Sequence, residues 1–404
     1  MEVDPADAGF DATRLKRIDA HFARYVDEGL LPGWLAVVSR YGRIIHTGSG
    51  GQRDMEAGLP VEPDTLWRIY SMTKPITSVA AMMLYEEGLL DLDDPVANWL
   101  PEFAAPSVYV KGSSLRPVTE PATEPIRVWH LLTHTAGLSY GFHHANPVDA
   151  LYRAAGHEWS TPPGADLAEC VRQWASLPLV FQPGSEWNYS VATDVLGRLV
   201  EVISGLPLDV FFSERIFAPL GMTETGFWTE ETGRLAALYL PAPKTRRAVR
   251  NDAFGALGTT RPDCLSGGGG LVSTAGDYHR FTQMLLRGGE LDGVRLLAPR
   301  TVGLMASNHL PGHVDLEAFG RPLFAEMPFD GYGFGLGFSV LEDPVKARTL
   351  ASAGEFAWGG AASTAFWVDP DEDLTVAFYT QLLPSSTHRI RQQLRQLVYQ
   401  ALID

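Results

Sequence analysis

The stretch LWRIYSMTKPITSVAAMMLYEEG at residues 66–88 decides how the rest of the chain is interpreted. Its apolar residues recur at helical spacing. Pro75 is tolerated only near the start of a helix, where its missing N–H has no helical partner to lose. Gly88 stands where a glycine commonly ends a helix. The spacing therefore predicts a helix whose first turn carries Ser71.

Lys74 follows Ser71 by three residues, so both side chains lie on one face of the predicted helix. A helix N-terminus gathers unpaired N–H groups and partial positive charge, which stabilise an oxyanion. The same field opposes a positive charge on Lys74, and an uncharged amine can activate a neighbouring hydroxyl. This S-x-x-K spacing is typical of serine enzymes that transfer acyl groups. The alternative is that Ser71 only begins the helix and Lys74 is a solvated charge, because so short a motif also arises by chance.

Composition limits the class of protein. A chain of 404 residues suits one large domain or two joined domains, and a net charge of −16 argues against nucleic acid or an anionic membrane as partner. We find no run of ~20 apolar residues and no signal peptide, so we expect a soluble cytoplasmic protein. Cys170 and Cys264 are isolated thiols, which indicate neither a disulfide framework nor a metal site.

Strand patterns lie near both ends of the chain, and helical patterns lie between them. The segments at 34–40 and 43–48 predict one β-hairpin, and those at 363–369 and 374–380 predict another. Both ends would then share one sheet. We therefore expect an α+β fold with a central antiparallel sheet flanked by helices and a helix-rich insertion.

The predicted domain division follows from this pattern. Residues 1–88 and 255–404 would form the sheet domain, and residues 89–254 the inserted helix-rich domain. Within the insertion, residues 89–125 are rich in Asp, Pro and Ser and predict loops with short helical pieces. The active site would lie in the cleft between the two domains, a usual place for a ligand.

Two further segments supply candidates for the site. FQPGSEWNYS at 181–190 places Tyr189 just before a predicted helix, where its phenol could carry a proton between nucleophile and leaving group. GEFAWGGAAS at 354–363 places Gly359 and Gly360 at a strand edge, where the backbone can approach a ligand and offer an N–H. The alternatives are a tyrosine packed at an interface and an ordinary turn beside a strand.

Three ordered motifs carry a family resemblance: Ser71-Met72-Thr73-Lys74, Tyr189-Ser190 and Trp358-Gly359-Gly360. They resemble the motifs of the serine β-lactamase and penicillin-binding-protein superfamily. The chain is most similar to class C β-lactamase-like carboxylesterases, often called family VIII esterases. Other stretches that resemble this family are HLLTHTAGL (130–138), PLGMTETGF (219–227), GGGLVSTAGDYHRF (268–281) and GYGFGLGF (331–338).

The resemblance implies a β-lactamase-like fold and Ser71 as the nucleophile that accepts the acyl group. It implies that Lys74 and Tyr189 share the base and acid roles, and that the backbone N–H groups of Ser71 and Ala361 form an oxyanion hole. Val191 replaces the Asn of the β-lactamase Y-x-N motif, and W-G-G replaces K-T-G, so no cation is expected there for a β-lactam carboxylate. Both departures favour small or apolar esters over β-lactams.

Substrate contacts are expected from the W-G-G strand edge and from aromatic residues that could line an acyl pocket. The residues concerned are Trp358, Gly359, Gly360, Tyr140, Phe142 and Phe356. The expected chemistry needs no cofactor and no metal ion.

Two rival motifs point to other chemistry. Gly137-Leu138-Ser139-Tyr140-Gly141 matches G-x-S-x-G, which would make Ser139 the nucleophile of an α/β-hydrolase. That motif requires a strand before it and a helix after it, whereas here a helical pattern precedes it and a loop follows. His130 and His134 have the spacing of zinc ligands on a helix, but the glutamate of H-E-x-x-H is missing. We therefore expect neither an α/β-hydrolase nucleophile nor a metal site.

The function expected from the sequence is a serine carboxylesterase. It would hydrolyse short-chain or small apolar carboxylic esters through a covalent acyl-enzyme, as a monomer or homodimer whose only partner is a small-molecule ester. On the same scaffold, the alternatives are an acyltransferase, a β-lactamase or D-amino-acid peptidase, and an amide hydrolase. The alternative from a different class is a non-catalytic binding protein.

Overall fold

The computed structural model describes residues 3–159, 161–321 and 328–404. Its centre is an eight-stranded sheet with the order β12-β13-β14-β15-β16-β1-β2-β3, in which every neighbouring pair is antiparallel. The strands of this sheet are Gly33–Arg40 (β1), Arg43–Asp54 (β2), Leu59–Pro60 (β3), Tyr332–Phe334 (β12), Ser339–Leu341 (β13), Phe356–Gly359 (β14), Ala365–Asp369 (β15) and Leu374–Tyr379 (β16).

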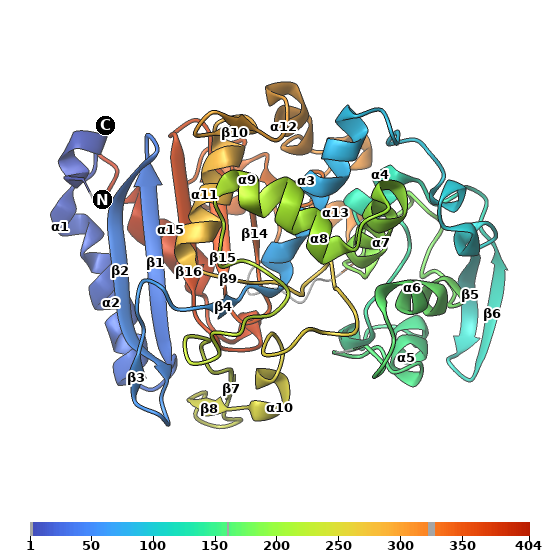
Figure 1. Ribbon diagram of the computed structural model, residues 1–404, viewed down its shortest axis with the longest axis horizontal. Helices are drawn as coiled ribbons and strands as arrows, with labels where there is room; N and C mark the ends of the chain where they lie inside the picture. Colours follow the sequence, from blue (N-terminus) through green and yellow to red (C-terminus); the bar gives the residue numbers. More distant parts are fainter. Residues whose placement is uncertain (1–2, 160, 322–327) are drawn as a thin grey trace.

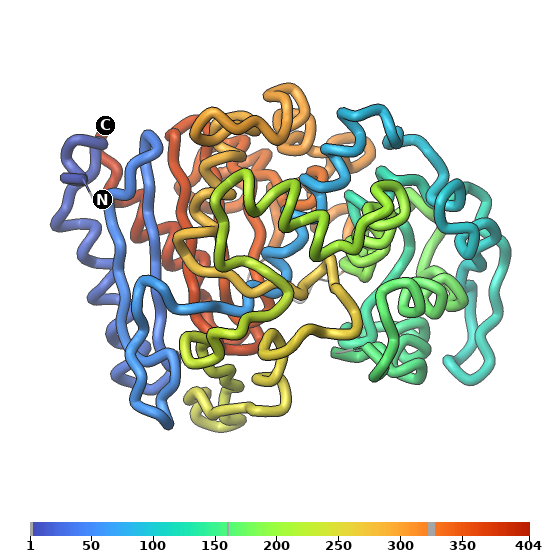
Figure 2. Tube along the Cα trace, viewed as in Figure 1, coloured from blue at the N-terminus to red at the C-terminus, as the bar shows by residue number. Residues whose placement is uncertain are grey.

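The two ends of the chain share this sheet because β1 pairs with β16, with Leu35 opposite Tyr379. Both termini accordingly lie on the same side of the molecule (Figure 2). All eight residues of β1 are buried, which requires helices on both faces of the sheet. The expected α+β fold with a central antiparallel sheet is confirmed, as are the two expected hairpins, β1–β2 and β15–β16.

Helices cover both faces of the sheet. The α-helices are Ala12–Leu15 (α1), Arg17–Asp27 (α2), Thr73–Glu86 (α3), Val128–Leu132 (α4), Pro147–Ala154 (α5), Leu167–Ala175 (α6), Ala192–Ser204 (α7), Leu208–Phe212 (α8), Ala218–Leu220 (α9), Asp252–Gly255 (α10), Ala275–Leu286 (α11), Pro299–Met305 (α12), Leu316–Phe319 (α13), Pro344–Ala347 (α14) and Ile390–Tyr399 (α15). On one face, Phe22 of α2 contacts Phe378 of β16, with ring centroids 4.7 Å apart. On the other face, Gln283 of α11 donates to Thr375 at 2.8 Å. Thr375 and Phe378 stand at positions of opposite parity on β16, so their side chains leave the sheet on opposite faces.

The structure differs from expectation between residues 107 and 121. Ser107–Ser113 (β5) and Arg116–Pro121 (β6) form a hairpin at the end of the molecule farthest from β1 and β2 (Figure 1). The expectation of only loops and short helical pieces here is therefore wrong. All six residues of β6 are exposed, so no alternation of apolar and polar residues marks the strand in the sequence. The division of the chain into two domains at residues 88 and 254 stays a prediction.

None of the helices in the three described ranges combines the length and the apolar composition that crossing a bilayer would require.

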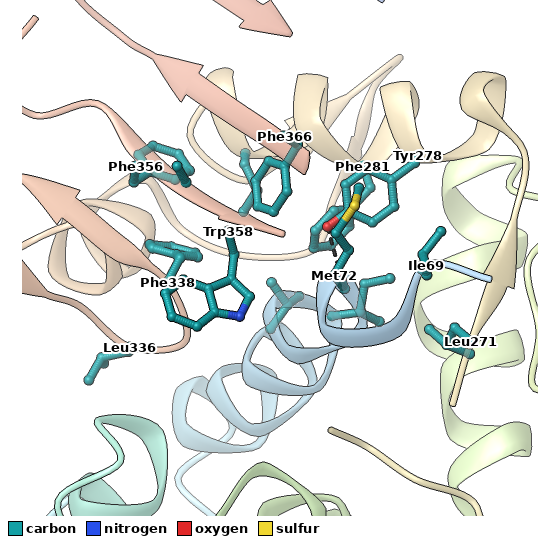
Figure 3. Close-up of a cluster of buried hydrophobic side chains, with 14 of the residues drawn as sticks. Ile69, Met72, Leu271, Tyr278, Phe281, Leu336, Phe338, Phe356, Trp358 and Phe366 are labelled. Atoms are coloured by element: carbon teal, nitrogen blue, oxygen red, sulfur yellow. Dashed lines mark hydrogen bonds between the residues drawn. The ribbon is translucent and has the colours of Figure 1, made fainter. Parts of the chain in front are cut away.

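Met72 anchors the start of α3 beneath the sheet. Its side chain is fully buried and points into a cluster of apolar side chains that includes Phe366 and Tyr278 (Figure 3). The hydroxyl of Tyr278 donates to the carbonyl of Met72 at 2.9 Å. Neighbouring residues of a helical turn point in different directions, so burying Met72 in this cluster turns Ser71 away from the core.

Candidate active site

Ser71 lies in a short 3-10 turn, Tyr70–Met72 (η2), that leads directly into α3. The helix predicted around this residue is present, and Gly88 adopts a positive φ of 70° just beyond its end. Tyr70 also has a positive φ, of 44°. This conformation is strained for any residue other than glycine, and it turns the chain sharply just before Ser71.

The structure brings together the alcohol of Ser71, the amine of Lys74 and the phenol of Tyr189. The Tyr189 hydroxyl donates to Ser71 Oγ at 2.6 Å. Lys74 Nζ lies 3.3 Å from the same oxygen and 4.5 Å from the centre of the Tyr189 ring. The indole N–H of Trp358 donates to the Tyr189 hydroxyl at 3.4 Å. A proton on Ser71 is therefore within reach of two groups that can accept it.

Lys74 is only 1% exposed, so it is not a solvated charge. Its amine donates to the carbonyl of Gly268 at 2.6 Å and to the hydroxyl of Tyr140 at 3.2 Å. An uncharged amine that donates to these two oxygens keeps its lone pair for the proton of Ser71. The two contacts also fix the nitrogen beside Ser71.

Two histidines pack around Tyr189. The Nε2 of His143 lies 2.6 Å from the carbonyl oxygen of Tyr189, and the ring of His134 lies 5.0 Å from the phenol ring. Burial lowers the pKa of His134 well below its ordinary value. Burial also lowers the pKa of His143. Both imidazoles are therefore neutral near pH 7 and hold Tyr189 without adding charge to the site.

Ser71 and Tyr189 line a cavity of about 380 Å³, whereas Lys74 does not contribute to its wall. Tyr140 and Phe142 line this cavity, as expected from the sequence. The Tyr140 ring stacks on Phe142 at 4.6 Å, and Phe142 stacks on Trp159 at 4.5 Å, so three rings form one row. Trp159 was not among the predicted site residues, because the sequence around it has no motif or periodicity.

The W-G-G segment also lines the cavity, at the end of β14. A Cβ atom at Gly360 would lie 2.4 Å from the carbonyl oxygen of Ile69, two residues before Ser71. Glycine is therefore required for the strand end to approach the Ser71 turn this closely. The absence of a side chain at Gly360 thus lets the W-G-G segment lie against the turn that carries Ser71, although the two are remote in sequence.

Two backbone N–H groups at this junction are available to a ligand. In the part of the chain that the structure describes, no internal acceptor takes the N–H of Ser71 or of Ala361. Both residues are half-buried and line the cavity. Free N–H groups beside a nucleophile are what stabilisation of an oxyanion requires.

Phe356 does not lie where the sequence placed it. It is 1% exposed, stacks with Phe338 at 4.7 Å, and belongs to the apolar cluster of Figure 3 rather than to the cavity wall. Phe356 precedes Trp358 on the same face of β14 by two residues, about 7 Å along the strand. That step carries its ring into the core, so Phe356 does not line the cavity as the sequence predicted.

Arg391 of α15 is a cavity residue that sequence reasoning missed. Its Nη2 donates to the carbonyls of Gly360 at 3.1 Å and Thr364 at 3.2 Å. We expected no cation beside the W-G-G segment, and the structure places this guanidinium there. No local motif could have revealed it, because the two segments meet only through the packing of α15.

The rival motifs have structural roles. Ser139 is fully buried, outside the cavity wall, and its hydroxyl donates to Asp149 at 2.6 Å. His130 accepts the N–H of Arg127, and His134 shares a hydrogen bond with Ser190. Across the described residues, no three His, Cys, Asp or Glu side chains are grouped so as to hold a metal ion.

The comparison with known families gives the class of the protein. The family model described as Beta-lactamase matches residues 18–400. The chain therefore belongs to the beta-lactamase family, and it has the β-lactamase-like fold that the three motifs suggested.

Individual relatives indicate the class of enzyme within this family. Esterase EstB of Burkholderia gladioli is 34% identical over 398 residues, which cover 94% of this chain and 93% of that protein. Protein Rv1367c of Mycobacterium tuberculosis is 39% identical over 362 residues, 89% of this chain and 88% of that one. The solved structure of EstCE1, titled a hydrolase with promiscuous acyltransferase activity, has a TM-score of 0.80 and 30% identity, covering 96% and 98% of the two chains. Taken with the family, these likenesses identify a serine hydrolase.

Proposed function

We propose that the protein is a carboxylesterase for small apolar esters and that Ser71 is its nucleophile. The observation that carries the proposal is the 2.6 Å contact between the hydroxyls of Tyr189 and Ser71, with Lys74 Nζ 3.3 Å from Ser71 Oγ. The 34% identity to an esterase supports the same reaction class.

In the acylation step, Ser71 Oγ attacks the carbonyl carbon of the ester and forms a new C–O bond. Its proton passes to Lys74, either directly or through the hydroxyl of Tyr189. The electron pair of the carbonyl π bond moves onto oxygen, and that oxyanion lies between the N–H groups of Ser71 and Ala361. The apolar surroundings strengthen these interactions because little water competes for them.

Collapse of the tetrahedral intermediate re-forms the carbonyl and breaks the bond to the alcohol. The departing alkoxide takes a proton from Tyr189, which regains one from Lys74. Water then attacks the acyl-enzyme along the same path, so that the carboxylic acid leaves and Ser71 recovers its proton. The cycle consumes one ester and one water, and no other reactant.

The walls of the cavity favour apolar substrates. Val191 lines the cavity where an amide would grip an acylamino group, and the row of Tyr140, Phe142 and Trp159 offers flat apolar surface. The Nη2 of Arg391 is engaged by two backbone carbonyls, which reduces its availability to a β-lactam carboxylate.

A panel of p-nitrophenyl esters of increasing acyl length, set against a chromogenic cephalosporin, tests this proposal. We expect the short esters to show kcat/KM values higher than the cephalosporin by orders of magnitude. An intact-mass measurement should detect the acyl-enzyme, and peptide mapping should locate the acyl group on Ser71. A cephalosporin preferred by the same margin would overturn the substrate assignment, and an acyl group on another serine would overturn the mechanism.

Acyl transfer to an alcohol is a second candidate, favoured by the likeness to EstCE1 and its printed acyltransferase activity. The same acyl-enzyme would serve, with an alcohol in place of water. Adding a primary alcohol to the ester assay and measuring the ratio of new ester to free acid decides between them. A ratio that exceeds the alcohol-to-water concentration ratio would identify a transferase, and a ratio below it a hydrolase.

A further inference from the structure

Asp194 is a buried carboxylate for which the proposed mechanism has no role. It lies in the first turn of α7 and is 4% exposed. Over the residues that the structure covers, no lysine, arginine or histidine lies within ion-pair distance of it. Burying a carboxylate without a cation is unfavourable, so the surrounding groups must offset it.

Two hydrogen bonds join Asp194 to the loop that holds Lys74. Asp194 Oδ1 accepts from the hydroxyl of Ser266 at 2.5 Å and from the N–H of Gly268 at 3.0 Å. The carbonyl of the same Gly268 accepts from Lys74 Nζ at 2.6 Å. Asp194 therefore holds Gly268 in place, and the carbonyl of Gly268 in turn holds the amine of Lys74.

Residue 268 is a glycine because the carboxylate of Asp194 lies so close to its backbone. A Cβ atom at Gly268 would lie 2.5 Å from Asp194 Oδ2. Any larger residue would push the carboxylate and the loop apart. Within the glycine run at 267–270, Gly268 thus packs its backbone against a charged group.

A second path between Asp194 and Lys74 passes through Tyr140. Lys74 Nζ donates to the Tyr140 hydroxyl at 3.2 Å. Burial raises the pKa of Tyr140 well above its ordinary value, and the negative charge of Asp194 adds to the rise. The Tyr140 hydroxyl therefore stays protonated and lies between the amine and the carboxylate.

We propose that Asp194 is a positioning residue for the proton transfer, because its charge stabilises the ammonium that Lys74 becomes and its hydrogen bonds keep the amine beside Ser71. The proposal rests on the proposed function. The proton leaves Ser71 Oγ, the amine becomes an ammonium, and Asp194 gains no proton. Charge stabilisation of this kind acts over several ångströms in a poorly hydrated interior.

The other titratable groups near this pair come from several elements. They are Tyr140, Tyr189, His134, His143, His157, Cys170 and Cys264. Burial lowers the pKa of all three histidines, so none of them carries a competing positive charge at neutral pH.

Asp194→Asn tests the charge, because it keeps the shape of the side chain. The readouts are kcat/KM for a p-nitrophenyl ester and the rate at which a fluorophosphonate probe labels Ser71, each measured across pH. We expect both to fall about 10- to 100-fold, with KM unchanged. The acidic limb of the pH profile should move to lower pH, because removal of an anion makes protonation of the nearby base less favourable.

Two matched variants separate charge from anchoring. Ser266→Ala removes a hydrogen bond of Asp194 but keeps the charge, so its pH profile should stay in place. Asp149→Asn neutralises another buried carboxylate that holds a serine hydroxyl, at Ser139. We expect that variant to unfold at a lower temperature without a shift of the profile.

The inference is overturned if Asp194→Asn keeps the labelling rate and the profile of the wild type, or if Ser266→Ala reproduces its shift. Should Asp194→Asn not fold, Asp194→Glu retains the charge with altered geometry. An acidic limb in its wild-type position would support the charge role, and a displaced one would refute it. A wild-type Ser71 that the probe cannot label would instead remove the proposed function itself.

Discussion

Ser71 and Ser139 both stand in short motifs typical of serine hydrolases, yet the fold surrounds them in opposite ways. Ser71 is half-buried at a cavity wall, and its oxygen meets an amine and a phenol. Ser139 is fully buried, and its hydroxyl is committed to the carboxylate of Asp149. A serine reacts where a proton acceptor and a path for substrate coincide, and only the first site offers both.

The contrast also concerns what each carboxylate does. Asp149 accepts from the Ser139 hydroxyl and from the N–H groups of Ala145 and Asn146, which immediately precede α5, so its hydrogen bonds stabilise local structure. Asp194 uses its hydrogen bonds to hold the loop beside Lys74. Asp149 therefore stabilises the start of a helix, whereas Asp194, by our inference, assists a proton transfer.

Replacing the two serines separates the regions most strongly. Ser71→Ala should reduce kcat by at least about 10,000-fold, because it removes the hydroxyl that forms the acyl-enzyme in the proposed mechanism. Ser139→Ala should keep kcat within about fivefold of the wild type when measured per folded molecule. Ester hydrolysis by both variants, with circular dichroism to confirm folding, checks this. An inactive Ser139→Ala variant together with an active Ser71→Ala variant would identify Ser139, in the G-x-S-x-G motif, as the nucleophile.

Replacing one tyrosine in each region should give the next largest difference. Tyr189→Phe should lower kcat about 100- to 1,000-fold, since it removes the hydroxyl that lies 2.6 Å from Ser71 Oγ. Tyr152→Phe removes a buried hydroxyl that accepts the N–H of Ser139 at 3.3 Å, and it should leave kcat nearly unchanged. Equal losses in both variants would mean that packing, and not proton transfer, accounts for the effect.

The two serine replacements should affect the free energy of unfolding in the reverse order of their effects on kcat. Ser139→Ala should lower the free energy of unfolding by about 1.5–3 kcal/mol, because a buried hydrogen bond to a carboxylate is lost. Ser71→Ala should change that free energy by less than about 0.5 kcal/mol, since its hydroxyl faces a cavity. Urea unfolding of both variants measures the difference. A Ser71→Ala variant that is the less stable of the two would contradict the assignment of roles.

Acid should lower the stability of the protein through His130, the first histidine of the rival H-x-x-x-H motif. Burial lowers the pKa of His130 to about 4, and the charge of Arg127 adds to the effect, whereas in the unfolded chain the imidazole titrates near pH 6.5. Between these values the unfolded state binds more protons, so stability falls as the pH falls from 6.5 towards 4. The loss from pH 7.5 to 5 should be about 2 kcal/mol for this residue.

Urea midpoints of the wild type and His130→Gln at the two pH values measure this contribution. The variant has no imidazole at this position, so its stability should depend less steeply on pH. An equal pH dependence in both proteins would mean that other buried histidines, such as His134, account for the whole effect.

The sequence predicted the parts of the molecule that local patterns encode. Helical spacing placed Ser71 and Lys74 on one turn, and alternating patterns placed the two hairpins that join the ends of the chain in one sheet. The sequence did not predict the exposed hairpin at 107–121, because a strand without a buried face has no apolar alternation to detect.

What the sequence by itself determined is therefore the face on which each short segment carries its chemistry, because periodicity within a few residues fixes side-chain direction. Only the tertiary structure decided which faces meet. It brought the hydroxyl of Tyr189 to Ser71, the carbonyl of Gly268 to Lys74 and the guanidinium of Arg391 to the strand edge, and it turned Phe356 into the core. These meetings depend on packing between segments far apart in the chain, and no local pattern records that packing.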